Sequence, residues 1–456
     1  MKEAVDGDES KIASTWCSVV ADNTMVNPAA ARMLEREHPT IFFNGCRAHF
    51  ADLLIEQLAK IKEFDLFIAD CSMMIKFILN HSKVKEAYKR IAKELKKGTM
   101  VKLFSETRFA HIALMLDSLL GDDDCNIDIM RAMILEDKWE RGTCAGINAG
   151  EIEAFRTLVQ DTDFIAKVKC LSQLFSIASA YVHHQETPGI RASFILPLYK
   201  ALERDVEVWI EKKGRNNFMA PTMASIRDCI RVRWIGVPRQ NLIGIYAPQY
   251  LMAWILDPVM SPEREVLPQC WKADCGSIVK RFYPEGPDRL AAMSELRSCI
   301  LRENTFGEEL ELAQKELGKM SGLPPAVGTL GHVAHEIKRQ KVALQSTDPV
   351  QLWKLDIGPT CPKLCDIALR LLMMGTQSAD VERACKANKL VHTKVRNRLS
   401  NKNVKMLLFC YRNLRVLKKD IADGGERLDA EHLMEGFLND ALLEELAEPD
   451  NDSCTA

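Results

Sequence analysis

SADVERACKANKLVHTKVRNRLSNKNVKMLLFCYRNLRVL, residues 378–417, is the stretch around which the rest of the sequence is organised. After Glu382, no Asp or Glu occurs before Asp420, whereas twelve Lys and Arg residues occur from Arg383 to Lys419. Such a basic segment suits contacts with the phosphates of a nucleic acid. A solvated helix face is the alternative that the pattern leaves open.

The second half of this stretch predicts an amphipathic helix. Ser400 is the expected N-cap, and apolar residues follow at a spacing of three and four: Val404, Leu407, Leu408, Tyr411, Leu414 and Leu417. This stripe is expected to pack in a core.

Composition indicates a soluble globular protein of two to three domains. The 456 residues are 47% hydrophobic and 27% charged, with a net charge of -2. This charge excludes a protein that binds nucleic acid through its overall charge, so any such affinity must come from local basic surface. The 15 Cys include no CxxC pair, which is typical of reduced thiols in the cytosol or nucleus. Neither a signal peptide nor a membrane-spanning helix is expected.

The N-terminal part predicts short strands that alternate with helices. Residues 11–20 (KIASTWCSVV) predict a buried strand, and Asp22 follows where a parallel strand would end. A helix (AAARMLEREH) and a second strand at 41–43 come next. A Cys46-x-x-His49 pair then precedes an apolar helix that is expected to run from His49 to about residue 61. Residues 99–103 predict a third strand.

Each of these residues also has a simpler interpretation. Asp22 with its neighbouring Asn is a common turn pair. Cys46 and His49 are interpreted as structural, because one CxxH is half of a zinc site and no second half follows nearby. The adjacent His183 and His184 point about 100° apart on a helix and are interpreted as surface residues.

The two ends of the sequence together resemble hAT-family DNA transposases. The resemblance rests on ADN…IFFNGCRAHF at one end and on Glu382-Arg383, His392-Thr393-Lys394 and Arg396-Asn397-Arg398 at the other. It implies a ribonuclease H-like sheet in which Asp22 and Glu382 are catalytic carboxylates that hold Mg²⁺. Ala21, Cys385 and Lys386 depart from the family pattern.

The resemblance also implies residues that contact DNA. Arg108 and Phe109 stand where the family usually has Arg-Trp, and an aromatic face suits stacking on a base. A helix-starting Arg beside a core Phe is the open alternative. The basic side chains implied near the catalytic edge are Arg383, Lys394, Arg396 and Arg398.

The long middle of the chain predicts a helical insertion. Amphipathic segments such as FIAKVKCLSQLFSIASAYV recur between Pro- and Gly-containing breaks. The expected fold class is α/β plus a large all-α part, mostly helical overall, in which an incomplete ribonuclease H-like sheet is interrupted by this insertion. The expected domains are residues 1–109 (partial sheet), 110–347 (helical insertion), 348–420 (return to the sheet and dimerisation region) and 421–456 (acidic tail).

The family's first catalytic Asp would lie upstream of the strand that ends at Asp22. The sequence therefore predicts a transposase-derived, N-terminally truncated and catalytically incomplete protein. No cofactor is expected, with Mg²⁺ bound only if the missing strands are restored. The expected partners are a second copy of the chain and DNA, with no membrane and no small-molecule substrate, in the nucleus or the cytoplasm. A full transposase that lacks an annotated N-terminal exon and a helical interaction scaffold remain the alternatives.

Overall fold

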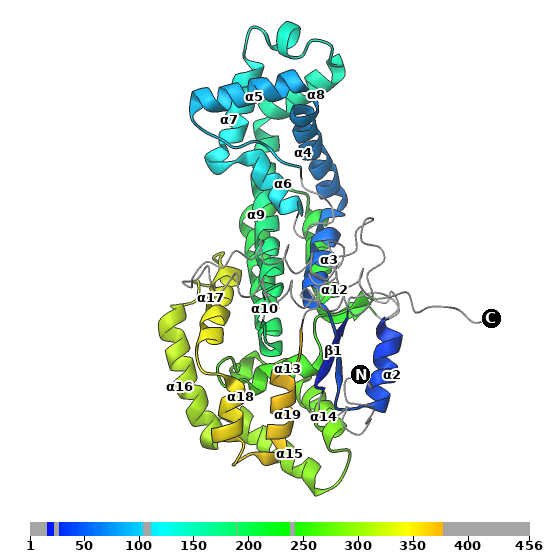
Figure 1. Cartoon of the computed structure of the whole chain (residues 1–456), viewed down its shortest axis with the longest axis vertical. Coiled ribbons are helices and arrows are strands. Elements are labelled where there is room, and N and C mark those ends of the chain that lie inside the picture. Colours follow the sequence, from blue (N-terminus) through cyan, green and yellow to red (C-terminus); the bar gives the residue numbers. More distant parts are fainter. Residues whose placement is uncertain (1–15, 22–26, 104–110, 188, 238–241, 377–456) are drawn as a thin grey trace, which may run out of the picture. The chain divides into compact units, whose positions relative to one another are not determined.

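The computed structural model describes residues 16–376 except 22–26, 104–110, 188 and 238–241 (Figure 1). Contacts within the chain define two compact units, residues 1–377 and 378–456, so every described residue lies in the first unit. The described part is mostly helical and contains two small two-stranded sheets. This confirms the predicted combination of a small strand region with a large helical part. The ribonuclease H-like identity of the sheet stays a prediction.

The first sheet pairs two short parallel strands. Strand β1 (Ser18–Ala21) pairs with β2 (Phe42–Gly45), in a register that places Ser18 opposite Phe42 and Ala21 opposite Gly45. Helix α2 (Asn27–Glu37) makes the connection between them, as parallel strands require. The predicted strand–helix–strand order is confirmed here.

The prediction that the first strand is buried is wrong. All four residues of β1 are partly exposed, whereas β2 is mostly buried. Within the described residues β1 pairs with β2 alone, so its other edge has no strand to cover it.

The predicted third strand at residues 99–103 is also wrong. These residues form no strand, although Val101 is buried. Side chains take up the local backbone groups: Asn126 Oδ1 accepts from Thr99 N at 3.1 Å, and the Tyr88 hydroxyl donates to Thr99 O at 2.9 Å. Backbone groups satisfied by side chains do not need a neighbouring strand.

Helices make up most of the rest of the unit. The longer ones are α3 (Arg47–Ala59), α4 (Lys62–Asn80), α5 (Ser82–Leu95), α6 (His111–Leu120), α7 (Cys125–Ile134), α8 (Ala149–Gln160), α9 (Thr162–Gln185), α10 (Ile195–Trp209), α12 (Ala220–Ile235), α13 (Pro248–Leu256), α14 (Trp271–Phe282), α15 (Pro287–Ile300), α16 (Asn304–Ser321), α17 (His332–Gln345) and α19 (Pro362–Leu372). Shorter elements are α11 (Arg215–Asn217), α18 (Pro349–Leu352) and the strands β3 (Gly236–Val237) and β4 (Leu242–Ile243), which pair antiparallel.

Helix α9 is central to the packing because it contacts α3, α6 and α10 (Figure 1). Its apolar residues are buried on more than one side, which explains why the helix is hydrophobic around most of its circumference. Trp209 at the end of α10 is fully buried and donates its indole N–H to Cys170 O at 2.9 Å. The run of helices predicted over this region is confirmed, but α9, which was predicted to be amphipathic, is buried on more than one face.

The prediction that both adjacent histidines lie on the surface is wrong for His184. His183 is exposed, but His184 is 3% exposed and bonds through Nε2 to Gln340 Oε1 at 2.8 Å. Helix α17 covers this end of α9, and burial lowers the pKa of His184. A residue on a helix that is covered by a later helix cannot be recognised as buried from its immediate neighbours.

A buried carboxylate on α10 holds the start of α17. Asp205 is 1% exposed and accepts three backbone N–H groups: from Gly331 at 2.9 Å, His332 at 2.9 Å and Val333 at 2.8 Å. Gly331 takes a left-handed conformation with φ of 110°, which a side chain would disfavour. Asp205 thereby satisfies the otherwise unpaired N–H groups of the first turn of α17.

We expect Asp205→Ala to destabilise the chain by roughly 3 kcal/mol or more, because it leaves three partly or fully buried donors without an acceptor. Asp205→Asn keeps an acceptor oxygen and should cost less. Urea unfolding followed by circular dichroism measures both variants. Asp228→Asn, which removes an exposed carboxylate paired with Arg231, is the control and should change stability by less than about 1 kcal/mol. Equal losses in Asp205→Ala and Asp228→Asn would contradict this role.

Candidate functional site

The carboxyl ends of β1 and β2 form the edge where the sequence places its candidate site. Ala21 and Gly45 are the last paired residues of the two strands, and Cys46 N donates to Ala21 O at 2.7 Å. Helix α3 begins at Arg47, directly after this bond. Ligands and catalytic groups commonly lie at this edge of a parallel sheet.

The chain returns to this edge after α19. Gly375 N donates to Ser18 Oγ at 3.0 Å, and Asn44 Nδ2 donates to Gly375 O at 3.0 Å. Arg47 N donates to Thr376 O, also at 3.0 Å. Residues 375–376 therefore lie against both strands and against the first turn of α3.

Most of the predicted site residues fall outside the described residues. These are Asp22, Arg108, Phe109, Glu382, Arg383, Lys394, Arg396 and Arg398. The described residues next to the two expected carboxylates are nevertheless informative. Ala21, which precedes Asp22, bonds to Cys46, and Thr376, six positions before Glu382, bonds to the adjacent Arg47. The structure thus brings the chain on either side of the helical middle to one place.

Cys46 and His49 lie at the start of α3. Cys46 is 3% exposed and His49 is half-buried. Helix α3 starts at Arg47, two residues before the predicted start at His49. Among residues 16–376, outside the gaps given above, no group of three or more His, Cys, Asp or Glu side chains lies close enough to hold a metal ion.

The sequence reasoning missed the polar residues that join the two halves of this edge. Asn44 is 1% exposed and also accepts from Gln249 Nε2 at 3.3 Å, while the buried Thr376 donates to Ile190 O at 3.0 Å. Asn44 follows two Phe residues at the end of a strand, which is a weak local signal of a buried polar residue. Gln249 and Ile190 carry no such signal.

A cavity of about 520 Å³ opens beside the strand ends. Its lining includes Gly45, Arg47, Tyr246, Gln249, Ser277 and Arg281. Arg281 is held firmly: it donates to Pro39 O and Ile41 O at 2.6 and 3.0 Å and pairs with Glu35 at 3.6 Å. Burial lowers the pKa of Arg281, and Glu35 opposes this shift.

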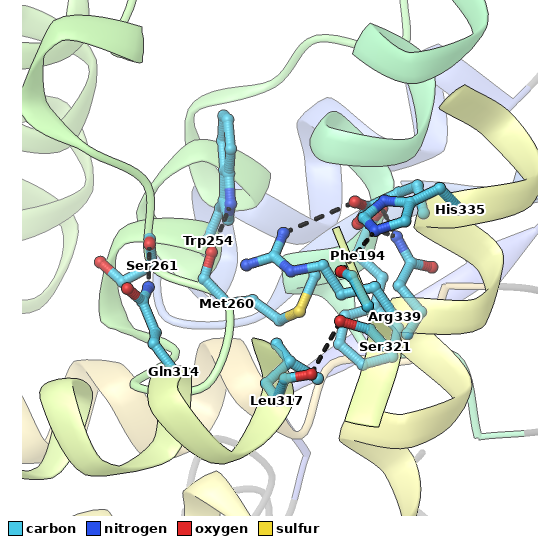
Figure 2. Close-up of polar contacts among 12 residues, drawn as sticks. Phe194, Trp254, Met260, Ser261, Gln314, Leu317, Ser321, His335 and Arg339 are labelled. Atoms are coloured by element: carbon cyan, nitrogen blue, oxygen red, sulfur yellow. Dashed lines mark hydrogen bonds and ion pairs between the residues drawn. The ribbon is translucent and has the colours of Figure 1, made fainter. Parts of the chain in front are cut away.

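A second cavity, of about 390 Å³, lies between α10, the end of α13, α16 and α17. Figure 2 shows that polar groups around it bond to one another. Trp254 Nε1 donates to Met260 O at 2.8 Å, Gln314 Nε2 donates to Ser261 O at 2.7 Å, and Arg339 pairs with Glu336 at 3.5 Å (Figure 2). The bond of Gln314 joins α16 to the segment after α13, whereas the other two contacts are local. The cavity at the strand ends adjoins the predicted site and is the stronger candidate for a functional site.

Comparison with known families assigns the C-terminal part of the chain. Residues 333–414 match the hAT family C-terminal dimerisation region. The match confirms the predicted resemblance to hAT transposases and supports a transposase-related protein that self-associates. No curated protein matches the chain. None of the described helices is long and apolar enough to cross a bilayer.

We expect Asn44→Ala to loosen the return of residues 375–376 to the sheet. The variant loses the bond to Gly375 O and leaves that carbonyl without this donor, which costs about 1–3 kcal/mol. Hydrogen exchange measured by mass spectrometry should show faster exchange in peptides that contain Arg47, whose N–H bonds to Thr376 O. The matched control, Asn217→Ala, removes an exposed bond to Lys213 O and should leave exchange at Arg47 unchanged. Unchanged exchange in Asn44→Ala would contradict the role given to this residue.

Proposed function

We propose that the chain is a hAT transposase-derived protein that dimerises, binds DNA at the strand ends, and does not cut DNA as this 456-residue polypeptide. The observation that carries the proposal is the match of residues 333–414 to the dimerisation region of that family. This region includes residues 375–376, which bond to the carboxyl end of the sheet. The β1–α2–β2 unit, followed by α3, supports a ribonuclease H-like sheet.

Two carboxylates are assigned to the site in this proposal. Asp22 directly follows Ala21 at the end of β1, and Glu382 follows six residues after Thr376. In-line cleavage of a phosphodiester uses two divalent metal ions, and Mg²⁺ is held by several oxygen ligands. Two carboxylates hold such a metal pair weakly, so we propose DNA binding without cleavage. The nucleus is the proposed location because DNA is the proposed ligand.

The exposed faces of the matched helices support one choice of dimer surface. Helices α17 and α19 bury Val333, Ala343 and Leu371 within their own unit. Their exposed positions include charged residues such as Lys338, Lys341 and Asp366. Interface cores are poor in charged residues. We therefore assign self-association to the apolar stripe of residues 404–417, which lies outside the described residues.

We expect the full chain to bind a fluorescent DNA duplex with an affinity that falls steeply with salt, because phosphate contacts release counterions. The double variant Arg396→Gln/Arg398→Gln should bind more weakly, and the slope of log affinity against log salt should become shallower by about 2, or about 0.9 for each lost contact. Fluorescence anisotropy across a salt series measures both effects.

The control removes two arginines of α12, the half-buried Arg227 and the exposed Arg231, by Arg227→Gln/Arg231→Gln and should leave the slope unchanged. A flat salt response of the wild type would contradict DNA binding and would favour the helical scaffold. The same preparation should leave supercoiled DNA intact with Mg²⁺ or Mn²⁺. Nicking that is abolished by Glu382→Gln would instead establish an active nuclease.

A further inference from the structure

Arg47 is a buried cation whose charge is not matched within the described residues. Its side chain is 3% exposed and lines the cavity beside the strand ends. Its Nε donates to the Tyr250 hydroxyl at 3.1 Å, and its guanidinium lies 4.5 Å from the centre of the Tyr250 ring. In the described part of the chain, no carboxylate forms an ion pair with Arg47.

Burying the Arg47 guanidinium in this way costs free energy unless an anion pairs with it. A buried charge is normally paired, and stacking on aromatic rings offsets only part of the cost of removing it from water. Among the described residues, the other charged side chains that line the cavity are Glu35 and Arg281, which pair with each other at 3.6 Å. The described part of the cavity wall therefore carries one unmatched positive charge, that of Arg47.

Arg233 provides an internal comparison. It is also buried, at 7% exposed, and both guanidinium groups lie over the Phe50 ring, at 5.8 Å for Arg47 and 5.6 Å for Arg233. Arg233 donates to Gln57 Oε1 at 2.8 Å and to Leu53 O at 3.1 Å, so protein acceptors occupy two of its nitrogens. The terminal nitrogens of Arg47 have no such acceptor in the described residues, and Arg233 does not line the cavity.

We propose that the cavity beside the strand ends binds a phosphate group through the terminal nitrogens of Arg47. The planar guanidinium suits two parallel bonds to phosphate oxygens. Gln249, at the start of α13, lines the same cavity, and its Nε2 donates to Asn44 Oδ1 over a long distance of 3.3 Å. Its N–H₂ group provides a second donor there.

The source of the phosphate is a nucleic-acid strand, and this part of the inference rests on the proposed function. The cavity adjoins Gly45 and the first turn of α3, to which residues 375–376 bond. A strand held by one phosphate in this cavity would run past the edge to which Asp22 and Glu382 are assigned. Arg47 would then position the backbone and carry no sequence preference.

The first experiment compares thermal unfolding of the full chain in inorganic phosphate and in chloride at equal ionic strength. Phosphate stabilises many proteins without a specific site, so the readout is the difference between variants. Arg47→Met removes the buried charge at similar volume and should fold. A ligand at about 100 times its Kd adds about 2.7 kcal/mol, so the phosphate-dependent rise in Tm should be several degrees larger in wild type than in Arg47→Met.

Arg233→Met is the matched control, because it removes a buried arginine beside the same Phe50 ring but outside the cavity. Phosphate should raise the Tm of Arg233→Met by as much as it raises the Tm of wild type, whatever the stability of the variant in chloride. Arg47→Lys keeps the charge and should keep part of the effect. An equal phosphate-dependent rise in wild type and Arg47→Met would overturn the phosphate site.

The second experiment identifies the source by fluorescence anisotropy with single-stranded and duplex DNA across a salt series. Arg47→Met should bind more weakly, and its salt slope should be shallower by about 1, as expected for one lost phosphate contact. If phosphate raises the Tm of wild type more than that of Arg47→Met but the two bind DNA equally, the nucleic-acid source is wrong. Free phosphate compounds would then be the ligands. If Arg47→Met binds DNA as tightly as wild type does, and phosphate raises the Tm of both equally, the inference is wrong while the proposed function stands. Absence of wild-type DNA binding would overturn the proposed function.

Discussion

Hydrogen bonds between the end of β2 and residues 375–376 join parts of the chain that are 331 positions apart, and the candidate site depends on them. Asn44 reaches Gly375, Arg47 reaches Thr376, and Ser18 on β1 accepts from Gly375. Asn44, Arg47 and Thr376 are buried, so leaving their bonds unmade would cost free energy, whereas the bond between Gly375 and Ser18 is exposed. The helical middle of the chain must therefore begin and end at the same edge of the sheet.

The helices meet this requirement by packing into one continuous core. Helix α9 contacts α3 near the sheet and α10 along the helical region, while α19 packs on α13 and α15 before the chain returns to β1. Two buried carboxylates act as fixed points in this arrangement. Asp205 caps α17 from α10, and Asp257 accepts from Val259 N at 3.0 Å and from Ser193 Oγ. Burial raises the pKa of Asp257, although Arg191 and Ser193 act in the opposite direction.

Local patterns in the sequence predicted the elements better than they predicted contacts between distant residues. The short apolar runs at residues 11–20 and 41–43 and the three/four spacing of the middle helices were sufficient to predict strands and helices there. The prediction of a third strand was wrong because Tyr88 and Asn126 bond to the backbone of Thr99, which local composition does not reveal. The surface position predicted for His184 was wrong because α17 covers this residue. Arg47 was missed because only the structure shows that it is buried and that no carboxylate among the described residues forms an ion pair with it. The assignment of Asp22 and Glu382 came from a family resemblance and concerns residues outside the described part of the chain.

The proposed function depends on Asp22 and Glu382 lying together at the carboxyl end of the sheet, a placement that comes from the family resemblance. Site-specific photo-cross-linking tests it most directly, with a benzophenone amino acid placed at position 22 of the full chain and the products mapped by mass spectrometry. The account predicts cross-linked peptides that join position 22 to residues 378–386. Cross-links from position 22 that reach other parts of the chain, with none to residues 378–386, would contradict it.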